Sequence, residues 1–180
     1  LIGCGNIAET YFRAQDYFNN INFIACADKF SDAANKCAEQ YNIKPLSVDE
    51  ILKDKDIDVI LNLTIPQAHF TVSKQALEAG KHVYSEKPMS IKYDDAKHLL
   101  ELASKNKLYL GNAPDTFLGG GGQMSRELID KGEIGKILTG NFIFAFPGVQ
   151  EFHPNPESWF QFGGGPVIDM GPYFFTTLVN

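Results

Sequence analysis

The sequence predicts an α/β fold: a doubly wound parallel sheet with helices on both faces, followed by the beginning of an α+β domain with an open sheet. Short apolar runs alternate with segments of helical spacing from residue 1 to Asn112. A glycine-rich turn follows the first of these runs, and beyond Asn112 the alternation stops. We therefore expect one domain over residues 1–112 and the first part of a second over residues 113–180.

Five apolar runs are the expected strands of the first domain. Each is short and bounded by turn residues, which is typical of parallel strands covered on both faces. In chain order they read LIG at 1–3, INFIACA at 21–27, DVILNLT at 58–64, HVYS at 82–85 and KLYLGN at 107–112. Because helices separate them, we expect right-handed crossover connections.

Helical spacing of apolar residues fills the gaps between these runs. The expected helices cover residues 6–18, 31–41, 67–79 and 92–105. Ser31 and Ser90 stand at expected N-cap positions, and SVDE at 47–50 has the Ser-x-x-Glu form of a capping box. Gly80 suits the first residue after a helix C-terminus.

The pattern after Asn112 predicts mixed structure. A glycine-led helix is expected over 119–135, a long strand over 136–146 and a loop rich in Pro, Gly and aromatic residues over 147–165. The stretch GGGPVIDMGPYFF at 163–175 predicts a helix after a glycine-rich approach. Asp169 and Tyr173 are four residues apart and would share one face of it.

Composition excludes several classes of partner. The net charge is −6 and Lys and Arg are scattered, so we expect no nucleic-acid or anionic-membrane partner. No apolar run approaches the roughly 20 residues of a membrane span, so we expect a soluble, cytoplasmic protein. The three cysteines lack metal-ligand spacing, so we expect reduced packing residues and no metal site. Residues 1 and 180 lie inside an expected strand and helix, so we expect that neither end is native and that a signal peptide would not be visible.

The turn after the first strand, GCGNIA at 3–8, fits the pattern G-x-G-x-x-A. In dinucleotide-binding folds the first glycine permits the tight turn and the second lets backbone N–H groups approach a pyrophosphate. Gly3 and Gly5 occupy these positions, and Ala8 is the small residue that lets the helix pack on the strand. The motif predicts a Rossmann-type dinucleotide site.

Asp28 supports this prediction. It ends the second expected strand, 20 residues after Ala8, which is the spacing of the acid that binds the adenosine ribose. A carboxylate there repels a 2′-phosphate and slightly favours NAD over NADP, although the neighbouring Lys29 weakens that preference. The alternative is that Asp28 caps a helix or turn.

Two further motifs, TIPQAH at 64–69 and SEKP at 85–88, follow the third and fourth strands at the edge where such sheets bind ligands. In the first, Pro66 begins a helix and His69 lies in its first turn, as a cofactor contact or as a capping histidine. In the second, Lys87 precedes a proline. The Lys87–Pro88 peptide bond is therefore either trans or cis, and about 5–6% of X-Pro bonds in folded proteins are cis.

These motifs together resemble the Gfo/Idh/MocA family of nicotinamide-dependent oxidoreductases. The matching segments, in family order, are GCGNIA, Asp28, LNLTIPQAH, GKHVYSEKP, IDKGEIGK and GGGPVIDMG. The resemblance implies an N-terminal Rossmann domain and a C-terminal α/β domain whose open sheet mediates contacts between subunits. We therefore expect a homo-oligomer.

The resemblance also implies residue roles. Lys87 would lie beside the nicotinamide and hydrogen-bond the hydroxyl that is oxidised, where a cation stabilises a developing alkoxide. The implied cofactor-binding residues are Gly3, Gly5, Asn6 and Ile7 for the pyrophosphate, Asp28 and Lys29 near the ribose, and Thr64, Pro66, His69, Glu86 and Asn112 along the cleft.

Many family members complete the site with an Asp-x-x-x-His pair, and here Tyr173 replaces the histidine beside Asp169. Three acid/base assignments stay open: Lys87 alone, Tyr173 with a lowered pKa beside Lys87, or His153 of the 147–165 loop. Alternatively, Tyr173 is a core residue. His153 and Trp159 are also candidate sugar-binding residues, or parts of an interdomain or subunit contact.

The resulting hypothesis is an NAD- or NADP-dependent dehydrogenase or reductase acting on a secondary alcohol or ketone of a sugar, cyclitol or related polyol. Two alternatives remain. One is NAD-dependent glycoside cleavage through transient oxidation, and the other is a non-catalytic protein that senses NAD(P).

Overall fold

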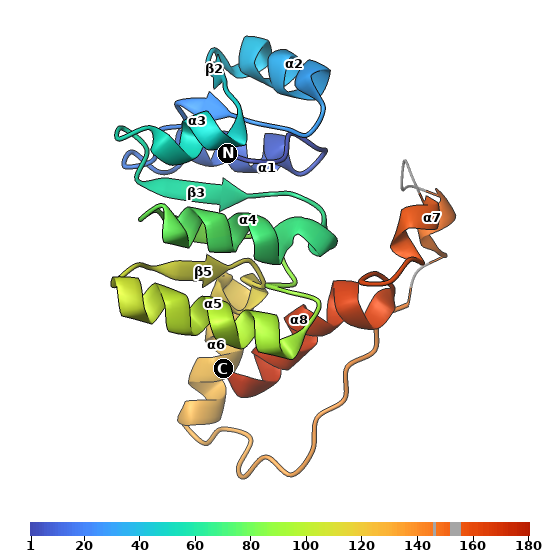
Figure 1. The fold of residues 1–180 in the computed structure, drawn as a ribbon. Helices are drawn as coiled ribbons and strands as arrows, with labels where there is room; N and C mark the ends of the chain where they lie inside the picture. The colour runs from blue at the N-terminus through green and yellow to red at the C-terminus, as the bar shows by residue number, and fades with distance from the viewer. Residues whose placement is uncertain (146, 152–155) are drawn as a thin grey trace. The chain divides into compact units, whose positions relative to one another are not determined.

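A computed structural model describes residues 1–145, 147–151 and 156–180. The chain forms two compact units, Leu1–Ala113 and Pro114–Asn180, which are described separately below (Figure 1).

The first unit contains two groups of parallel strands. Strand β1 (Ala25–Cys26) pairs with β2 (Lys44–Pro45), and β3 (Val59–Asn62) pairs with β4 (His82–Ser85), which pairs with β5 (Leu110–Asn112). Four of the expected strands are present as these short segments. Strand β2 was not predicted, because both of its residues are exposed and carry no apolar pattern.

Residues 1–3 join the two groups into one sheet. Ile2 forms parallel bridges to Ala27 on one side and Asn62 on the other. Its N–H donates to Leu61 O at 2.8 Å, and its carbonyl accepts from Leu63 N at 2.8 Å. With residues 1–3 as a strand, the spatial order is β2, β1, residues 1–3, β3, β4, β5. Counted along the chain this is the 3-2-1-4-5-6 order of the Rossmann fold, so the predicted doubly wound sheet is confirmed.

Helices cover both faces of this sheet (Figure 1). They are α1 (Ala8–Phe12), continued by the 3-10 helix η1 (Arg13–Asp16), then α2 (Ser31–Tyr41), α3 (Val48–Lys53), α4 (Pro66–Glu78) and α5 (Tyr93–Asn106). Successive strand residues point to opposite faces, which creates two cores. One contains Ile2, Ala25, Ile60 and Val83 with Ile51 of α3, Leu77 of α4 and Leu99 of α5; the other contains Leu1, Cys26 and Leu63 with Phe12 of α1 and Cys37 of α2.

Helix caps agree only partly with the sequence predictions. Ser47 and Glu50 form the predicted capping box, and Gly80, at φ +79°, follows the C-terminus of α4 as predicted. The N-cap prediction for Ser31 is wrong, because α2 begins at Ser31 itself and Phe30 is the N-cap. That for Ser90 is also wrong: its hydroxyl accepts from Lys92 N, so it orders the turn immediately before α5 instead of capping the helix.

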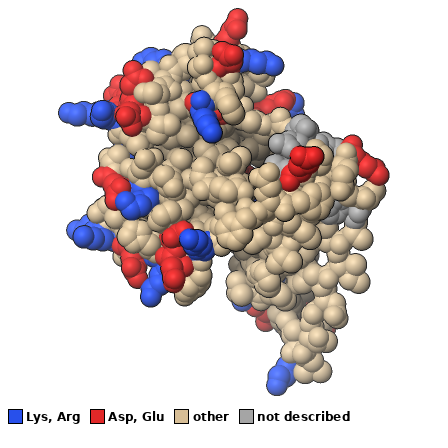
Figure 2. Space-filling view, turned by 45° about the vertical axis from the view of Figure 1, so that its right-hand side comes forward, with Lys and Arg blue, Asp and Glu red and all other residues tan. Residues whose placement is uncertain are grey.

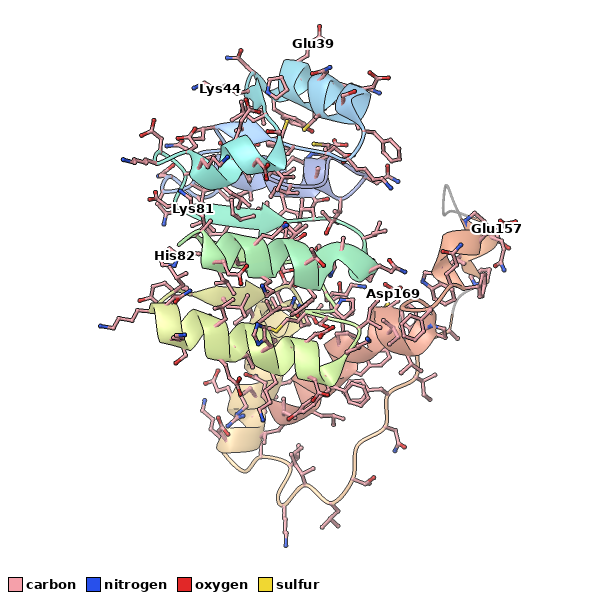
Figure 3. The ribbon with its side chains drawn as sticks, in the orientation of Figure 1. Glu39, Lys44, Lys81, His82, Glu157 and Asp169 are labelled. Atoms are coloured by element: carbon pink, nitrogen blue, oxygen red, sulfur yellow. The ribbon has the colours of Figure 1, made fainter. Side chains whose placement is uncertain are left out.

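A buried lysine stabilises the edge of the sheet at which the parallel strands begin. Lys81 precedes β4 and is only 9% exposed. Its ammonium group donates to the carbonyls of Asp54 and Ile57, at 2.5 and 2.6 Å. Figure 3 shows Lys81 and its neighbour His82 at this edge. Lys81 therefore holds the turn between α3 and β3, and its charge is satisfied by backbone oxygens.

The second unit contains helices joined by extended chain. Its elements are η2 (Thr116–Leu118), α6 (Gly120–Asp130), η3 (Val149–Glu151), α7 (Pro156–Trp159) and α8 (Pro166–Val179). The predicted glycine-led helix and the helix that carries Asp169 and Tyr173 are therefore present, although α6 ends before residue 135.

The strand predicted at 136–146 is not formed over its described residues, 136–145. Its side chains do alternate: the rings of Phe142 and Phe144 lie 5.3 and 6.2 Å from the ring of Phe174 on α8, whereas Ile143 between them is 93% exposed. A strand, however, also needs to pair with a neighbouring backbone, and the described residues of this segment belong to no strand pair. The alternation is present, but the strand predicted from it is wrong.

Charges on the surface are mixed. Figure 2 shows acidic and basic side chains interspersed on the face drawn. Several form exposed i, i+4 pairs along helices, such as Glu9 with Arg13 and Arg126 with Asp130. Within the described parts of the chain, no helix is long and apolar enough to cross a membrane.

Candidate functional site

Three polar residues end neighbouring strands of the first unit. The strand register places Asn62 of β3 beside Ser85 of β4, and Ser85 beside Asn112 of β5. The segments that follow these residues carry the motifs TIPQAH and SEKP. Since the carboxyl ends of parallel strands share one edge, this is where an open α/β sheet binds its ligand.

The glycine loop lies at the same edge. Gly3 has φ +99°, and a Cβ on it would lie 2.5 Å from Leu63 O, so the loop is pressed against the chain that leaves β3. Gly5 is exposed, and a Cβ there would meet nothing within 4 Å. Asn6 and Ile7 are also exposed. One glycine therefore fixes the loop, and the other leaves open space over its backbone.

Asp28 is tied to this loop. One carboxylate oxygen accepts from Cys4 N at 2.7 Å, and the other accepts from Phe30 N at 2.9 Å. Asp28 therefore has the turn role considered from sequence. Each oxygen still has a second lone pair, so the carboxylate can also accept from ribose hydroxyls. Lys29 is exposed, with its ammonium 5.9 Å from the centre of the Phe30 ring.

Glu86 connects three parts of the site. Its carboxylate accepts from the Tyr11 hydroxyl at 2.7 Å and from Lys87 N at 3.0 Å. Its carbonyl accepts from the Asn112 amide at 3.0 Å, and the same amide donates to Ser85 O at 2.9 Å. These bonds tie α1 and β5 to the turn that carries Lys87. Tyr11 was missed by the sequence analysis, since a half-buried tyrosine in a helix gives no specific signal.

His69 connects the two motif loops. It is 1% exposed, with Nδ1 at 2.6 Å from Pro88 O and Nε2 at 2.8 Å from Thr64 O. The imidazole therefore bridges the backbone after β3 and the backbone after Lys87. This places His69 within the wall of the site, and Pro66 begins α4 beside it.

The side chain of Asn62 holds the same part of the site in place. It is fully buried, and its amide donates to His69 O and to the Ser73 hydroxyl, both at 3.0 Å. Its carbonyl oxygen accepts from the Thr64 hydroxyl at 2.6 Å. The sequence analysis did not select Asn62, although a polar residue within the apolar run DVILNLT was a usable signal.

Lys87 lies half-buried at the start of the turn after β4. The peptide bond between Lys87 and Pro88 is cis, the less common of the two isomers considered from sequence. Its backbone N–H is held by the Glu86 carboxylate, and the next carbonyl faces His69. The predicted cofactor-binding residues and Lys87 all lie in the first unit, in the segments that end or follow its strands.

The remaining predicted residues belong to the second unit. Gly165, at φ +88°, precedes α8, and Tyr173 lies one turn after Asp169. Figure 3 shows Asp169 in the first turn of this helix. Asp169 and Tyr173 are both half-buried. The indole of Trp159 meets the Phe160 ring edge to face at 5.1 Å between ring centres. His153 lies outside the described residues.

Comparisons with known proteins agree for both units. Residues 1–113 match the family model described as "Oxidoreductase family, NAD-binding Rossmann fold", and residues 123–180 match the "GFO/IDH/MocA C-terminal domain". Among curated proteins, the chain is 28% identical over 179 residues to dTDP-3,4-didehydro-2,6-dideoxy-α-D-glucose 3-reductase of Saccharopolyspora spinosa, covering 96% of this chain and 52% of the relative. It is 26% identical over 143 residues to inositol 2-dehydrogenase of Salmonella typhimurium, covering 77% and 43%.

A solved structure gives the same result. A 3-ketoreductase from Actinomadura kijaniata, in complex with NADP and TDP-benzene, superposes with a TM-score of 0.83 at 26% identity. The alignment covers 94% of this chain and 52% of that protein. The chain therefore spans about half the length, or less, of the relatives it matches.

Proposed function

Since the chain belongs to the Gfo/Idh/MocA family of oxidoreductases, we propose that it binds NAD or NADP at the carboxyl edge of its sheet and transfers hydride between that cofactor and a sugar or cyclitol. The observation that carries the proposal is the common placement of the glycine loop, Asp28 and Lys87 at that one edge.

The residues at this edge fit a dinucleotide. The open space above Gly5 suits a pyrophosphate approached by backbone N–H groups, with Asn6 and Ile7 completing the loop. Asp28 would accept the ribose hydroxyls while remaining anchored to Cys4 N. Its negative charge favours NAD, because a 2′-phosphate would face like charge at close range. The nicotinamide supplies the hydride acceptor or donor.

Lys87 is the proposed catalytic residue. An ammonium group beside the reacting carbon stabilises a developing alkoxide, or donates a proton to a carbonyl that is being reduced. Its position depends on Glu86, which holds its backbone, and on His69, which holds the next residue. Glu86, His69 and Asn112 are positioning residues in this proposal, because each acts through the backbone that carries Lys87 or its neighbours.

The proposed substrate class is a secondary alcohol or ketone of a sugar or cyclitol. The relatives named above act on a dTDP-linked keto sugar and on inositol, and both molecules carry reactive centres of this kind. From the second unit we propose that Asp169 orients substrate hydroxyls and that Tyr173 assists proton transfer. The indole of Trp159 is the proposed stacking partner of a sugar ring, because aromatic rings pack well against the apolar faces of sugars.

Replacing Lys87 by alanine tests the proposal. The substrates would be myo-inositol and a dTDP-linked keto sugar, each with NAD(H) and NADP(H). We expect kcat to fall at least a hundredfold, because general acid catalysis contributes about 10²- to 10⁴-fold. The cofactor Kd, measured by calorimetry, should stay within a few fold. Lys105→Ala, an exposed lysine in the last turn of α5, is the matched control and should change neither quantity.

The outcomes separate the competing functions. Retained hydride transfer in Lys87→Ala would remove Lys87 from the chemistry. Cofactor binding without turnover of any substrate in the wild type would favour a sensor. Consumption of a glycoside without accumulation of NADH would indicate the glycoside-cleaving mechanism, which returns its hydride in every cycle.

A further inference from the structure

All three cysteines of the chain meet at one point beneath the glycine loop. Their sulfur atoms lie within 4.8 Å of one another, although the residues come from the loop (Cys4), β1 (Cys26) and α2 (Cys37). The spacing of the cysteines along the chain matches no metal motif and predicted reduced packing residues and no metal site. The fold creates a cluster that the spacing does not reveal.

The surroundings of the cluster are apolar. Cys26 is 0% exposed and Cys37 is 7% exposed, within the core that includes Leu1, Phe12 and Leu63. Cys4, on the glycine loop, is half-buried and is the most exposed of the three cysteines. A ligand of the cluster would therefore enter past Cys4 and end in a dry environment.

For Cys4 and Cys26 the protonated thiol is favoured over the thiolate. Burial, followed by the charges of its neighbours, raises the pKa of the Cys4 thiol, and the same causes raise that of Cys26 to about 11. The Cys4 thiol lies 3.5 Å from Ala27 O and the Cys26 thiol 3.4 Å from Ala34 O, as donors. Reactions that need a thiolate are therefore disfavoured at these thiols, because burying a negative charge in the apolar interior costs free energy.

The free-energy cost of burying negative charge favours some ligands of three sulfurs over others. Three thiolates around a monovalent or divalent metal ion would leave a net negative charge in the core, which is costly. A trivalent centre leaves none. Arsenous acid reacts with three thiols by exchanging its three hydroxyl groups: three As–S bonds form, three As–O bonds break, and each thiol proton leaves in a water molecule. No oxidant or reductant is needed, and the product is neutral.

The distances permit this product. Metal–sulfur bonds in proteins are about 2.3 Å long, and sulfurs that share one such centre lie roughly 3.3 to 4 Å apart. The cysteine sulfurs would each move by roughly 1 Å or less from positions within 4.8 Å of one another. We propose that Cys4, Cys26 and Cys37 form a trithiol site for trivalent arsenic, which would bond the glycine loop to β1 and α2.

Intact-mass spectrometry of the native protein treated with sodium arsenite tests this. Because the chain has no other cysteine, every arsenic–thiol bond must come from this cluster. We expect one arsenic per chain with the loss of three hydrogens. In Cys37→Ala and Cys4→Ala the retained arsenic should fall at least tenfold, since only two bonds remain. Met124→Leu, which changes an exposed sulfur in the second unit, should behave like the wild type.

Three results would overturn the proposal: no adduct in the wild type, an adduct that has lost only two hydrogens, or an undiminished adduct in the alanine variants. If the variants do not fold, the wild type alone decides through its melting temperature. Arsenite should raise Tm, because the three sulfurs converge only in the folded chain, and an unchanged Tm would refute the site. Neither readout depends on oxidoreductase activity.

Discussion

Gly3 and Gly5 lie two positions apart in the glycine loop, yet we expect substitution by alanine to have different effects at the two positions. In Gly3→Ala the new methyl would lie 2.5 Å from Leu63 O, at a φ of +99°. Left-handed backbone costs a residue with a Cβ about 1–2 kcal/mol, and overpacking adds about 1–3 kcal/mol. We therefore expect Gly3→Ala to lower the free energy of unfolding by about 2–5 kcal/mol.

Gly5→Ala should leave folding intact. Its methyl would meet nothing within 4 Å, so the free energy of unfolding should stay constant or rise by up to about 1 kcal/mol through the lower entropy of the unfolded chain. The same methyl would occupy the space proposed for the pyrophosphate. We expect the dinucleotide Kd to rise at least tenfold, which corresponds to about 1.4 kcal/mol.

Urea denaturation and calorimetric titration with NAD and NADP measure both effects on the same preparations. If Gly5→Ala binds the dinucleotide as tightly as the wild type, the space above Gly5 does not hold the pyrophosphate. If Gly5→Ala destabilises the fold as much as Gly3→Ala does, the two glycines have the same structural role and the distinction drawn between them is wrong.

Three further substitutions test other contacts. Tyr11→Phe removes the hydroxyl that donates to Glu86 at 2.7 Å and should lower the free energy of unfolding, measured by urea denaturation, by about 1.5 kcal/mol, because the acceptor is charged. Its control, Arg13→Ala, breaks an exposed ion pair and should lower it by less than about 0.5 kcal/mol. Equal losses of stability in the two variants would contradict this prediction. Asp28→Ser should raise the affinity for NADP relative to NAD at least tenfold, and an unchanged ratio of the two Kd values would mean that Asp28 does not discriminate. Lys81→Met should cost about 2–4 kcal/mol, since the buried Ile57 carbonyl and the partly buried Asp54 carbonyl lose their donor, and a loss below about 1 kcal/mol would show that water replaces the ammonium group.

Local sequence patterns predicted the elements whose signals are local. The bounds of α2 and β4 agree with the sequence prediction, because helical spacing and a bounded apolar run each identify one segment without reference to others. Pairing is different. The segment 136–146 has a strand-like alternation, yet its described residues form no strand, and β2 is paired without any apolar pattern.

The candidate site shows the same division. Its location at the carboxyl edge followed from the order of strands and motifs, and the residues of the first unit lie there as expected. The bonds that hold the site did not follow. Tyr11 and Glu86 are 75 residues apart, and the three cysteine sulfurs converge from three elements. No local pattern records such contacts, since they depend on the finished fold.

The position of residues 1–3 in the middle of the sheet has a consequence for the order of folding. These residues pair with residues 25–27 and with residues 61–63, so the sheet becomes continuous only when both partners are present. During synthesis, residues 1–3 can be paired on both sides only after the chain has grown past β3. Closing a loop of that length costs entropy before any pairing energy returns. Residues 1–3 are thus fully paired later than their place in the chain suggests, and until then their apolar side chains are available to chaperones.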